Sequence, residues 1–371
     1  MSAGLLAAPG APDVEGRVLV AMSGGVDSSV VAAKLKRDGL DIVGVSMRLY
    51  GREDAGATKS CCSPDDLYDA REVASGFGFP FYVANYQEAF REQIIGYFVD
   101  EYRKGRTPSP CILCNNHLKF DALLRRMRAL GGSRLATGHY ARIVEQGGRW
   151  ALLRGVDRAK DQSYFLFGLP RNELPHIWFP LGALTKHEVR QLGRDLGVST
   201  ADKRESQDIC FVAGRNYADF VRERLTEAEL VPGRLIRRDT GSVLGTHDGV
   251  HQFTVGQRRG IGFAAEVPLY VLSIDGGTGD VEVGPAELLA SDAFFIERPN
   301  WLRWEQPPER FECEVQVRYR HTPVRAVVEA AAQARWRVSF VAPERAVSPG
   351  QAAVFYEGDE VLGGGWIVGP A

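Results

Sequence analysis

The 371-residue chain lacks any apolar run near the roughly 18 residues that a membrane-spanning helix needs, so we expect no membrane association. It also lacks a basic excess, because 45 Lys and Arg stand against 47 Asp and Glu, a formal net charge of −2. Nucleic-acid binding would therefore have to use local patches. No basic, apolar leader opens the chain, so we predict a disordered tail over residues 1–16 and a cytoplasmic protein.

Cysteine is scarce as well, and a cytosolic compartment would keep thiols reduced, so a disulfide framework is not expected. The six cysteines are Cys61, Cys62, Cys111, Cys114, Cys210 and Cys313. Cys111 and Cys114 form a Cys-x-x-Cys that enters a predicted helix, where a thiolate is favoured, and Cys210 lies far along the chain. Three interpretations stay open for these three residues: packing in a core, metal or iron–sulfur binding, and sulfur transfer between a persulfide and a resolving thiol.

Two common nucleotide motifs are missing, the Walker Gly-x-x-x-x-Gly-Lys and the dinucleotide Gly-x-Gly-x-x-Gly. Instead, Ser23-Gly24-Gly25-Val26-Asp27-Ser28-Ser29 lies between a predicted strand and a predicted helix. Glycines let backbone N–H groups turn inward, and the start of a helix attracts anions. The segment resembles the PP-loop of N-type ATP pyrophosphatases, which cleave ATP between the α and β phosphates. Asp27 is expected to cap the helix or to help hold Mg²⁺.

The first part of the chain alternates strands with helices, which predicts a parallel sheet with ligands at the carboxyl ends of its strands. The expected strands are 17–22, 41–47, 80–84 and 134–137, and the expected helices are 27–37, 65–77, 87–103 and 116–130. After about residue 212, short strands and turns take over. Phe311 to Arg320 alternates apolar and polar residues, which predicts an antiparallel sheet or small barrel with Cys313 facing its core. We therefore predict an α/β domain over 17–212, a small mostly β domain over 213–288 and a C-terminal β-barrel over 289–371.

Several motifs occur together along the chain. They are Ala21-Met22-Ser23-Gly24-Gly25-Val26-Asp27-Ser28-Ser29; Gly105-Arg106-Thr107-Pro108 with Cys114-Asn115 and Lys119-Phe120; Ala136-Thr137-Gly138-His139-Tyr140; Lys160-Asp161-Gln162-Ser163-Tyr164-Phe165-Leu166; Asp208-Ile209-Cys210-Phe211; Thr254-Val255-Gly256-Gln257-Arg258-Arg259-Gly260; Arg318-Tyr319-Arg320; and Gly350-Gln351-Ala352-Ala353-Val354-Phe355-Tyr356. In combination they resemble the bacterial tRNA-specific 2-thiouridylase family over residues 17–367. That family has a PP-loop domain of the adenine nucleotide alpha hydrolase type and places sulfur on the wobble uridine of certain tRNAs.

The resemblance implies a role for each matching residue. ATP would contact Ala21, Met22, Ser23, Gly24, Gly25, Val26, Asp27, Ser28, Met47 and Gly138. Cys114 would be the nucleophile, and Cys210 would carry the persulfide. The anticodon stem-loop of tRNA would contact Ser109, Pro110, Cys111, Lys160, Asp161, Gln162, Arg318 and Tyr319.

The implied reaction uses ATP and Mg²⁺. The C2 oxygen of uridine attacks the α-phosphate, pyrophosphate leaves, and sulfur from the Cys210 persulfide then displaces AMP. Cys114 resolves the sulfur linkage, which leaves a Cys114–Cys210 disulfide that a reductant must open. An upstream sulfur donor protein would restore the persulfide.

Position 111 departs from the better-described members of the family, which carry a proposed general acid/base, Asp, where this chain has Cys111. A [4Fe-4S] cluster held by Cys111, Cys114 and Cys210 is therefore a second candidate for the sulfur carrier. Two hypotheses of another kind also stay open. The chain could be a different PP-loop adenylating synthetase that acts on a small metabolite, or a non-catalytic tRNA-binding protein with a relict nucleotide site.

The segment from Asp100 to Arg128 is locally basic, with seven Lys and Arg against three Asp and Glu, a balance of +4. These charges flank the Cys-x-x-Cys and could hold RNA phosphates there, although a solvated helix face gives the same pattern. His139 is open to two interpretations, because it could act near the nucleotide or serve as a hydrogen-bonded structural histidine.

Overall fold

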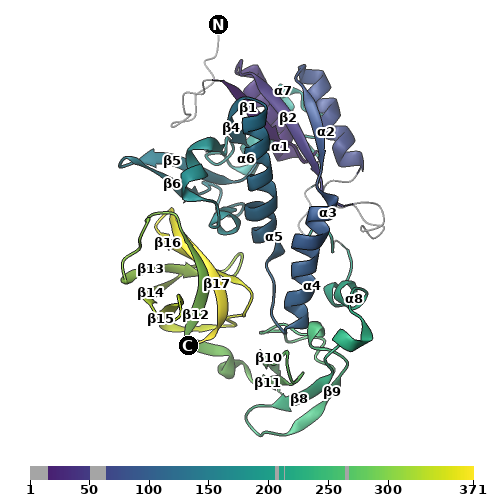
Figure 1. Ribbon diagram of the computed structural model, residues 1–371, viewed down its shortest axis with the longest axis vertical. Helices are drawn as coiled ribbons and strands as arrows, with labels where there is room; N and C mark the ends of the chain where they lie inside the picture. Colours follow the sequence, from purple (N-terminus) through teal and green to yellow (C-terminus); the bar gives the residue numbers. More distant parts are fainter. Residues whose placement is uncertain (1–15, 51–63, 205–208, 213, 264–266) are drawn as a thin grey trace. The chain divides into compact units, whose positions relative to one another are not determined.

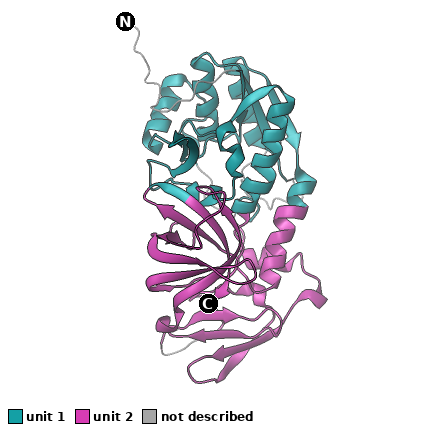
Figure 2. Ribbon diagram, turned by 60° about the vertical axis from the view of Figure 1, so that its left-hand side comes forward, with its two compact units in different colours: residues 1–91, 111–213, 359–361 teal, residues 92–110, 214–358, 362–371 magenta. Residues whose placement is uncertain are grey.

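The computed structural model describes residues 16–50, 64–204, 209–212, 214–263 and 267–371. The predicted tail (apart from its last residue) lies outside this range, as do Cys61 and Cys62. The chain forms two compact units (Figure 2). The first unit contains residues 1–91, 111–213 and 359–361, and the second contains 92–110, 214–358 and 362–371. No helix among the described residues is both long enough and apolar enough to span a bilayer.

The first unit is built on a five-stranded sheet in which all neighbouring strands are parallel (Figure 1). Its order is β3-β2-β1-β4-β7. The strands are β1 (Arg17–Ala21), β2 (Ile42–Arg48), β3 (Phe81–Asn85), β4 (Gly132–Ala136) and β7 (Ile177–Trp178). The chain runs outward from β1 through β2 to β3 and then returns to β4 on the other side of β1. The carboxyl ends of β1 and β4 thus flank a topological switch point, where ligands bind in such sheets.

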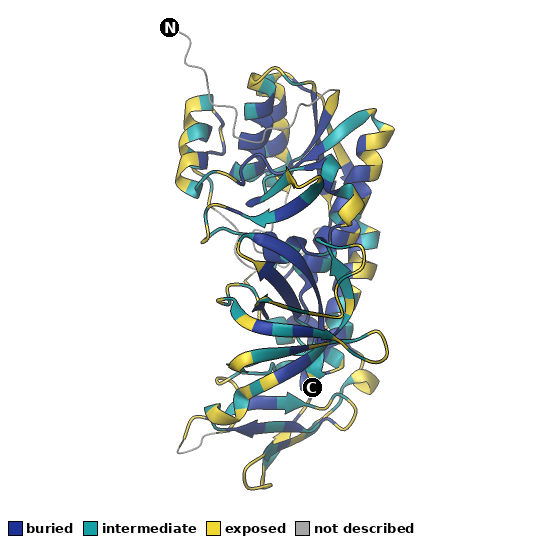
Figure 3. Cartoon of the chain, turned by 90° about the vertical axis from the view of Figure 1, so that its left-hand side faces the viewer, coloured by how far each residue is buried: buried dark blue, intermediate teal, exposed yellow. Residues whose placement is uncertain are grey.

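Helices pack on both faces of this sheet. They include α1 (Val26–Arg37), α2 (Pro64–Phe77), α6 (Asp121–Ala129) and α7 (Lys186–Leu196). Val18, Val20 and Met22 of the first strand segment share a buried cluster with α1, α2 and α7. Leu19 points to the opposite face, because side chains alternate along a strand, and α6 contacts β1 and β4 there. The central strands β1 and β2 are mostly buried, and Figure 3 shows exposed residues on the outer faces of the helices. The predicted parallel α/β class is confirmed.

The helix that carries the Cys-x-x-Cys begins earlier than predicted. The expected helix was 116–130, whereas α5 (Pro110–Leu113), the π-helical η2 (Cys114–Phe120) and α6 follow one another without a break. Proline is well tolerated in the first turn of a helix, so Pro110 starts this one instead of stopping it. The predicted helix 87–103 is found as α3 (Gln87–Phe90), the π-helical η1 (Arg91–Ile95) and α4 (Gly96–Arg103).

A β-hairpin and several short helical segments complete the first unit. The hairpin pairs β5 (Ala141–Gln146) with β6 (Arg149–Arg154), and Leu153 pairs in turn with Glu360. The 3-10 helices η3 (Ser163–Leu166) and η4 (Arg171–His176) follow the hairpin.

The second unit is mostly β-structure, as predicted. Its smaller sheet has the order β10-β11-β8-β9, and its larger sheet closes into a six-stranded barrel because β12 pairs with both β15 and β17. The strands of the smaller sheet are β8 (Gly233–Arg237), β9 (Val243–His247), β10 (Tyr270–Ile274) and β11 (Val281–Gly284). The barrel strands are β12 (Ala290–Trp301), β13 (Arg310–Gln316), β14 (Val324–Ala330), β15 (Trp336–Arg345), β16 (Ala352–Glu357) and β17 (Glu360–Pro370). Helix α8 (Tyr217–Arg222) precedes both sheets.

The barrel core confirms the predicted alternation in β13. Phe311, Cys313 and Val315 pack with the core cluster, and burial raises the pKa of the Cys313 thiol to about 12. The alternation ends at Gln316, which is buried although it is polar. Trp301 is partly buried and packs against this cluster, stacked on Phe355 with ring centroids 5.8 Å apart.

Candidate nucleotide and sulfur-transfer site

The glycine loop joins the carboxyl end of β1 to α1 at the switch point. Gly24 has a φ of +74°, and a side chain there would collide with the backbone of Asp66, with a Cβ only 2.0 Å from its carbonyl oxygen. Glycine is therefore required both by conformation and by space. Gly25 is the residue before α1, and no side chain caps this helix end. Amide N–H groups in the first turn of a helix have no intrahelical acceptor, so they can receive a phosphate.

Serine hydroxyls brace the loop from within. The Ser23 N–H donates to Ser28 Oγ at 3.1 Å, and Ser28 Oγ donates to the Gly25 carbonyl at 3.3 Å. Ser46 Oγ, from the neighbouring strand, donates to the Met22 carbonyl at 2.5 Å. Ser23 is exposed, whereas Ser28 is buried, so the Ser23 hydroxyl is the better placed of the two to reach a ligand.

Asp27 does not cap α1 but binds two side chains from distant parts of the chain. Lys186 Nζ lies 2.7 and 2.9 Å from the two carboxylate oxygens of Asp27, and the Tyr140 hydroxyl donates to the same carboxylate at 2.8 Å. Neither partner was predicted from the sequence. Lys186 follows Thr185, which forms a capping box with Glu188, so the sequence pattern there indicates only an ordinary helix start.

A second lysine fixes the loop from the other side. Lys203 Nζ donates to the Gly24 carbonyl at 3.1 Å and forms ion pairs with Asp66 and Asp69 of α2. Burial opposes its charge, but the two carboxylates hold the pKa of Lys203 above its ordinary value. No local motif in the sequence marks this residue.

The residues that follow β4 pack directly against the loop. A Cβ added to Gly138 would lie 2.9 Å from the Ser28 nitrogen and 3.0 Å from the Asp27 carbonyl carbon. The sequence predicted a close approach of Gly138 to the nucleotide, and the structure shows its close approach to the start of α1. Met47, near the end of β2, is buried. Both residues lie at the carboxyl edge of the sheet.

His139 has the environment of a structural histidine. Its Nδ1 lies 2.7 Å from Thr137 Oγ1, and its ring packs against Phe120 and Phe179 with centroids 5.7 Å away in each case. Burial, together with the positive charge of Lys119, lowers the pKa of His139 from 6.5 to about 3. The imidazole is therefore neutral at physiological pH.

The two cysteines of the Cys-x-x-Cys occupy successive turns at the start of one helix. Cys111 lies in the first turn of α5 and is half-buried, whereas Cys114 opens η2 and is buried. Residues three apart lie on the same side of a helix, and the positive end of the helix favours thiolates. Ser109 and Pro110, which precede Cys111, are buried.

The residue after Cys210 packs against a helix that contacts η2. Phe211 packs edge-on against Phe90 of α3, with ring centroids 5.7 Å apart, and α3 in turn contacts η2. Cys210 is half-buried, and Cys114 and Cys210 lie in the same compact unit. The four described cysteines form no disulfide. The described residues contain no group of three His, Cys, Asp or Glu side chains placed to hold a metal ion.

The residues expected to contact tRNA after the β5–β6 hairpin form a braced turn. The Asp161 carboxylate, only 8% exposed, pairs with Arg154 and accepts hydrogen bonds from the Gly155 and Ser163 N–H groups. Gln162 Oε1 accepts from the Tyr140 N–H at 2.9 Å. These contacts fix the shape of the turn that presents the half-buried Lys160.

In the second unit, Arg318 and Tyr319 lie just beyond the end of β13. Arg318 is exposed and donates to the Arg345 carbonyl at 3.3 Å, and the Arg320 guanidinium lies 5.4 Å from the Tyr319 ring centre. The same unit brings two of the sequence motifs together, because Gln351 Nε2 donates to the carbonyls of Thr107 and Pro108.

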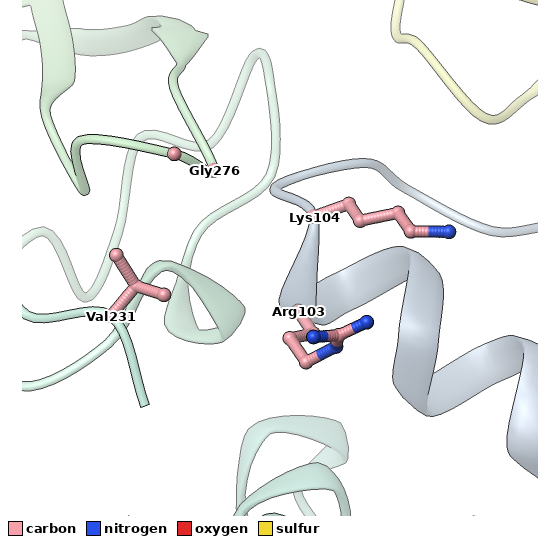
Figure 4. Close-up of a pocket in the computed structure, with 5 residues that line it drawn as sticks. Arg103, Lys104, Val231 and Gly276 are labelled. Atoms are coloured by element: carbon pink, nitrogen blue, oxygen red, sulfur yellow. The ribbon is translucent and has the colours of Figure 1, made fainter. Parts of the chain in front are cut away.

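Ion pairs reduce the effective charge of the basic segment from Asp100 to Arg128. At least five of its seven cations contact carboxylates: Arg103 and Lys104 pair with Asp100, Arg106 with Glu101, Arg125 with Asp121, and Arg128 with Glu173. Arg103 and Lys104 also line a pocket of about 320 Å³ with Val231, Gly276 and Gly277 (Figure 4). Their shared partner Asp100 compensates part of the positive charge there.

A glycine loop at the switch point of a parallel sheet, leading into an uncapped helix start, defines a nucleotide-binding α/β domain. Residues 16–214 match the tRNA methyl transferase HUP domain, residues 218–285 the tRNA methyl transferase PRC-barrel domain, and residues 291–367 the aminomethyltransferase beta-barrel domain. The chain belongs to the tRNA-specific 2-thiouridylase family.

Its similarity to curated members covers nearly their whole length. It is 49% identical to the tRNA-specific 2-thiouridylase MnmA of Geobacter metallireducens, with 95% of this chain and 96% of that protein aligned. It is 47% identical to the MnmA of Geotalea uraniireducens (95% and 94% aligned) and 47% identical to that of Carboxydothermus hydrogenoformans (96% and 99% aligned).

Proposed function

We propose that this chain is an ATP-dependent tRNA sulfurtransferase that forms 2-thiouridine at the anticodon wobble position. The observation that carries the proposal is the glycine loop at the β1/β4 switch point in the same compact unit as Cys114 and Cys210. The names of the relatives, which are 2-thiouridylases, support the same reaction. A metabolite synthetase would need the glycine loop but not the paired cysteines. A non-catalytic tRNA-binding protein would need the RNA contacts but not the paired cysteines.

The activation step uses the phosphate site. The C2 oxygen of uridine attacks the α-phosphorus of ATP, the bond from that phosphorus to the bridging oxygen breaks, and pyrophosphate leaves with the electron pair. The amides at the start of α1 and the Ser23 hydroxyl would bind the phosphates. Mg²⁺, when bound with ATP, would neutralise charge on the triphosphate, and the Asp27 carboxylate in the first turn of α1 would help to hold it.

The sulfur step uses the two cysteines of the first unit. The terminal sulfur of a Cys210 persulfide adds to C2 and AMP leaves, which gives a disulfide between the base and Cys210. The Cys114 thiolate then attacks the Cys210 sulfur. This releases 2-thiouridine and leaves a Cys114–Cys210 disulfide, which takes up two electrons from a reductant before a donor protein restores the persulfide.

Cys111 gives a second route that the same experiments can test. An iron–sulfur cluster on Cys111, Cys114 and Cys210 would carry the sulfur in place of the persulfide. The described residues show no three-ligand arrangement of this kind, so we derive no step through a cluster. Iron analysis of anaerobically purified protein would detect one.

The test is mass spectrometry of tRNA incubated with the protein, MgATP and a persulfide donor. We expect one sulfur in place of one oxygen at the wobble uridine, with pyrophosphate release that depends on tRNA. Cys210→Ser and Cys114→Ser should abolish sulfur insertion, whereas the matched variant Cys313→Ser, in the barrel core, should retain it. Full activity of Cys210→Ser would refute the persulfide role. Pyrophosphate release that is indifferent to tRNA would point to a metabolite synthetase.

A further inference from the structure

Lys186 reaches the nucleotide loop from a part of the chain 159 residues away. It is the first residue of α7, and its Nζ contacts both oxygens of Asp27 at 2.7 and 2.9 Å. The pair is enclosed, since the side chains of Lys186 and Asp27 are 11% and 28% exposed. Asp27 lies in the first turn of α1, the helix end at which an anion would bind.

The position of Lys186 is electrostatically costly for a cation. The start of a helix carries partial positive charge, which favours acidic residues and disfavours lysine. Here the lysine is directed away from its own helix. Its N–H donates to Asp157 at 2.9 Å, and its ammonium lies 5.7 Å from the centre of the Tyr140 ring. The first contact fixes the backbone of Lys186, and the second places its ammonium beside a ring whose hydroxyl also binds Asp27.

The reaction needs a cation at this place. Negative charge builds up on the departing pyrophosphate as the α–β bond breaks, and a fixed ammonium lowers the energy of that charge in a partly enclosed site. The loop itself, residues 23–29, contains no lysine or arginine. Among the described residues, Lys186 and Lys203 both reach this loop, but Lys203 is bound to Asp66 and Asp69 and to a carbonyl on the α2 side.

We propose that Lys186 is the phosphate-contacting cation of this site, supplied by α7 in place of a lysine within the loop. Without nucleotide, its charge is balanced by Asp27. When ATP binds, Lys186 donates hydrogen bonds to the β- and γ-phosphates and remains with the pyrophosphate as it leaves. It acts by charge and hydrogen bonding alone, and no proton is transferred. This role rests on the proposed adenylation of tRNA.

The test compares ATP and AMP, which share the adenosine and the α-phosphate but differ in the groups that Lys186 would contact. We expect Lys186→Gln to weaken MgATP binding by about tenfold or more, the scale of a charge-assisted hydrogen bond to phosphate, and to change AMP binding by less than about twofold. Titration calorimetry measures both affinities. The matched control is Lys34→Gln, on the same α1 helix, whose lysine pairs with Asp38 and should affect neither ligand.

A purely structural role for Lys186 predicts a different result. If the lysine only holds Asp27 and the loop in position, Lys186→Gln will weaken the binding of ATP and of AMP equally. That outcome overturns the proposal, and so does an unchanged affinity for ATP. If the glutamine variant does not unfold cooperatively, Lys186→Arg replaces it. Arginine keeps the charge, so the preference for ATP over AMP must persist, and loss of that preference in a folded protein also overturns the proposal. These binding measurements do not need tRNA, so a wild-type protein that binds ATP but never thiolates tRNA would refute the proposed function alone.

Discussion

At the scale of single residues, the site separates groups that are positioned for chemistry from groups that stabilise it. Cys111 and Cys114 lie in the first turns of a helix, where thiolates are favoured, whereas the Cys313 thiol is buried in the barrel with a raised pKa. His139 belongs to the second kind. Its depressed pKa and its aromatic neighbours keep it neutral, which argues against a general-base role that cycles through the imidazolium.

The low pKa of His139 predicts acid destabilisation. Because the folded-state pKa of about 3 lies below the unfolded value of 6.5, the unfolded chain binds more protons between these two pH values. The contribution of neutral His139 to the free energy of unfolding is therefore fully present above about pH 6.5 and falls as the pH drops through this window, by up to about 1.4 kcal/mol per pH unit. Denaturant unfolding at several pH values should show a slope of this sign, and His139→Asn should make it shallower by the share that His139 contributes. An identical slope in the variant would contradict the assignment. The pKa values of His247, His251 and His321 are also lowered by burial and contribute with the same sign.

At the scale of elements, glycines in the loops after β1 and β4 allow close backbone contacts with neighbouring segments. Gly24 avoids the backbone of Asp66, and Gly138 avoids the first turn of α1. Each contact joins two segments at the carboxyl edge of the sheet. The phosphate site is thus held in shape by backbone packing as well as by the Lys203 and Tyr140 side chains.

Gly138→Ala should damage this edge. The added Cβ meets backbone on α1, which cannot move aside as a flexible side chain would, so we expect a loss of about 1–3 kcal/mol in stability and about tenfold or more in ATP affinity. The matched control is Gly76→Ala on α2, where a Cβ meets nothing within 4 Å and helix propensity should stabilise by up to about 1 kcal/mol. Denaturant unfolding and calorimetry measure both effects. Wild-type ATP affinity in Gly138→Ala would show that this contact does not shape the site.

The sequence predicted those parts of the site that have a local pattern. The glycine loop, its flanking strand and helix, and the apolar alternation of β13 depend on neighbouring residues, and all were found close to the expected positions. The start of the cysteine helix was predicted too late, because a proline-containing loop was expected where Pro110 begins the helix. Lys186 and Lys203 could not be predicted. Their partners lie 159 and between 134 and 179 residues away, and a single lysine at a helix start has no periodic signature.

At the scale of the whole molecule, the compact units are discontinuous in sequence. Residues 92–110 belong to the second unit, although they lie between segments of the first, and residues 359–361 belong to the first. There Asp359 pairs with Arg142 and Arg158, and Glu360 pairs with Arg149. The predicted domain boundaries at 212 and 288 remain predictions, and the contacts divide the chain differently.

This division predicts that the nucleotide-binding segment will be less stable alone than in the full-length chain. In the second unit, Phe98 of α4 is fully buried and packs against Phe220 at 6.1 Å, and Tyr102 stacks on Tyr217 at 4.7 Å. A chain that ends at residue 213 keeps Phe98 and Tyr102 but loses Phe220 and Tyr217. Each exposed aromatic forfeits roughly 1.5–3 kcal/mol of burial. We therefore expect a lower melting temperature and strong binding of a hydrophobic dye.

Substitution of Phe98 and Tyr102 tests whether the truncated chain is destabilised by the loss of their packing partners or for another reason. In the truncated chain, Phe98→Gln with Tyr102→Gln removes the exposed apolar surface, so dye binding should fall although the nucleotide loop is untouched. In the full-length chain the same pair should be destabilising, because it deletes contacts that the second unit makes. The double substitution should therefore reduce dye binding in the truncated chain and lower the stability of the full-length chain. Both results together are expected only if residues 92–110 pack with residues 214–358. A truncated chain that melts like the full-length protein and binds no dye would show that α4 needs no partner from beyond residue 213.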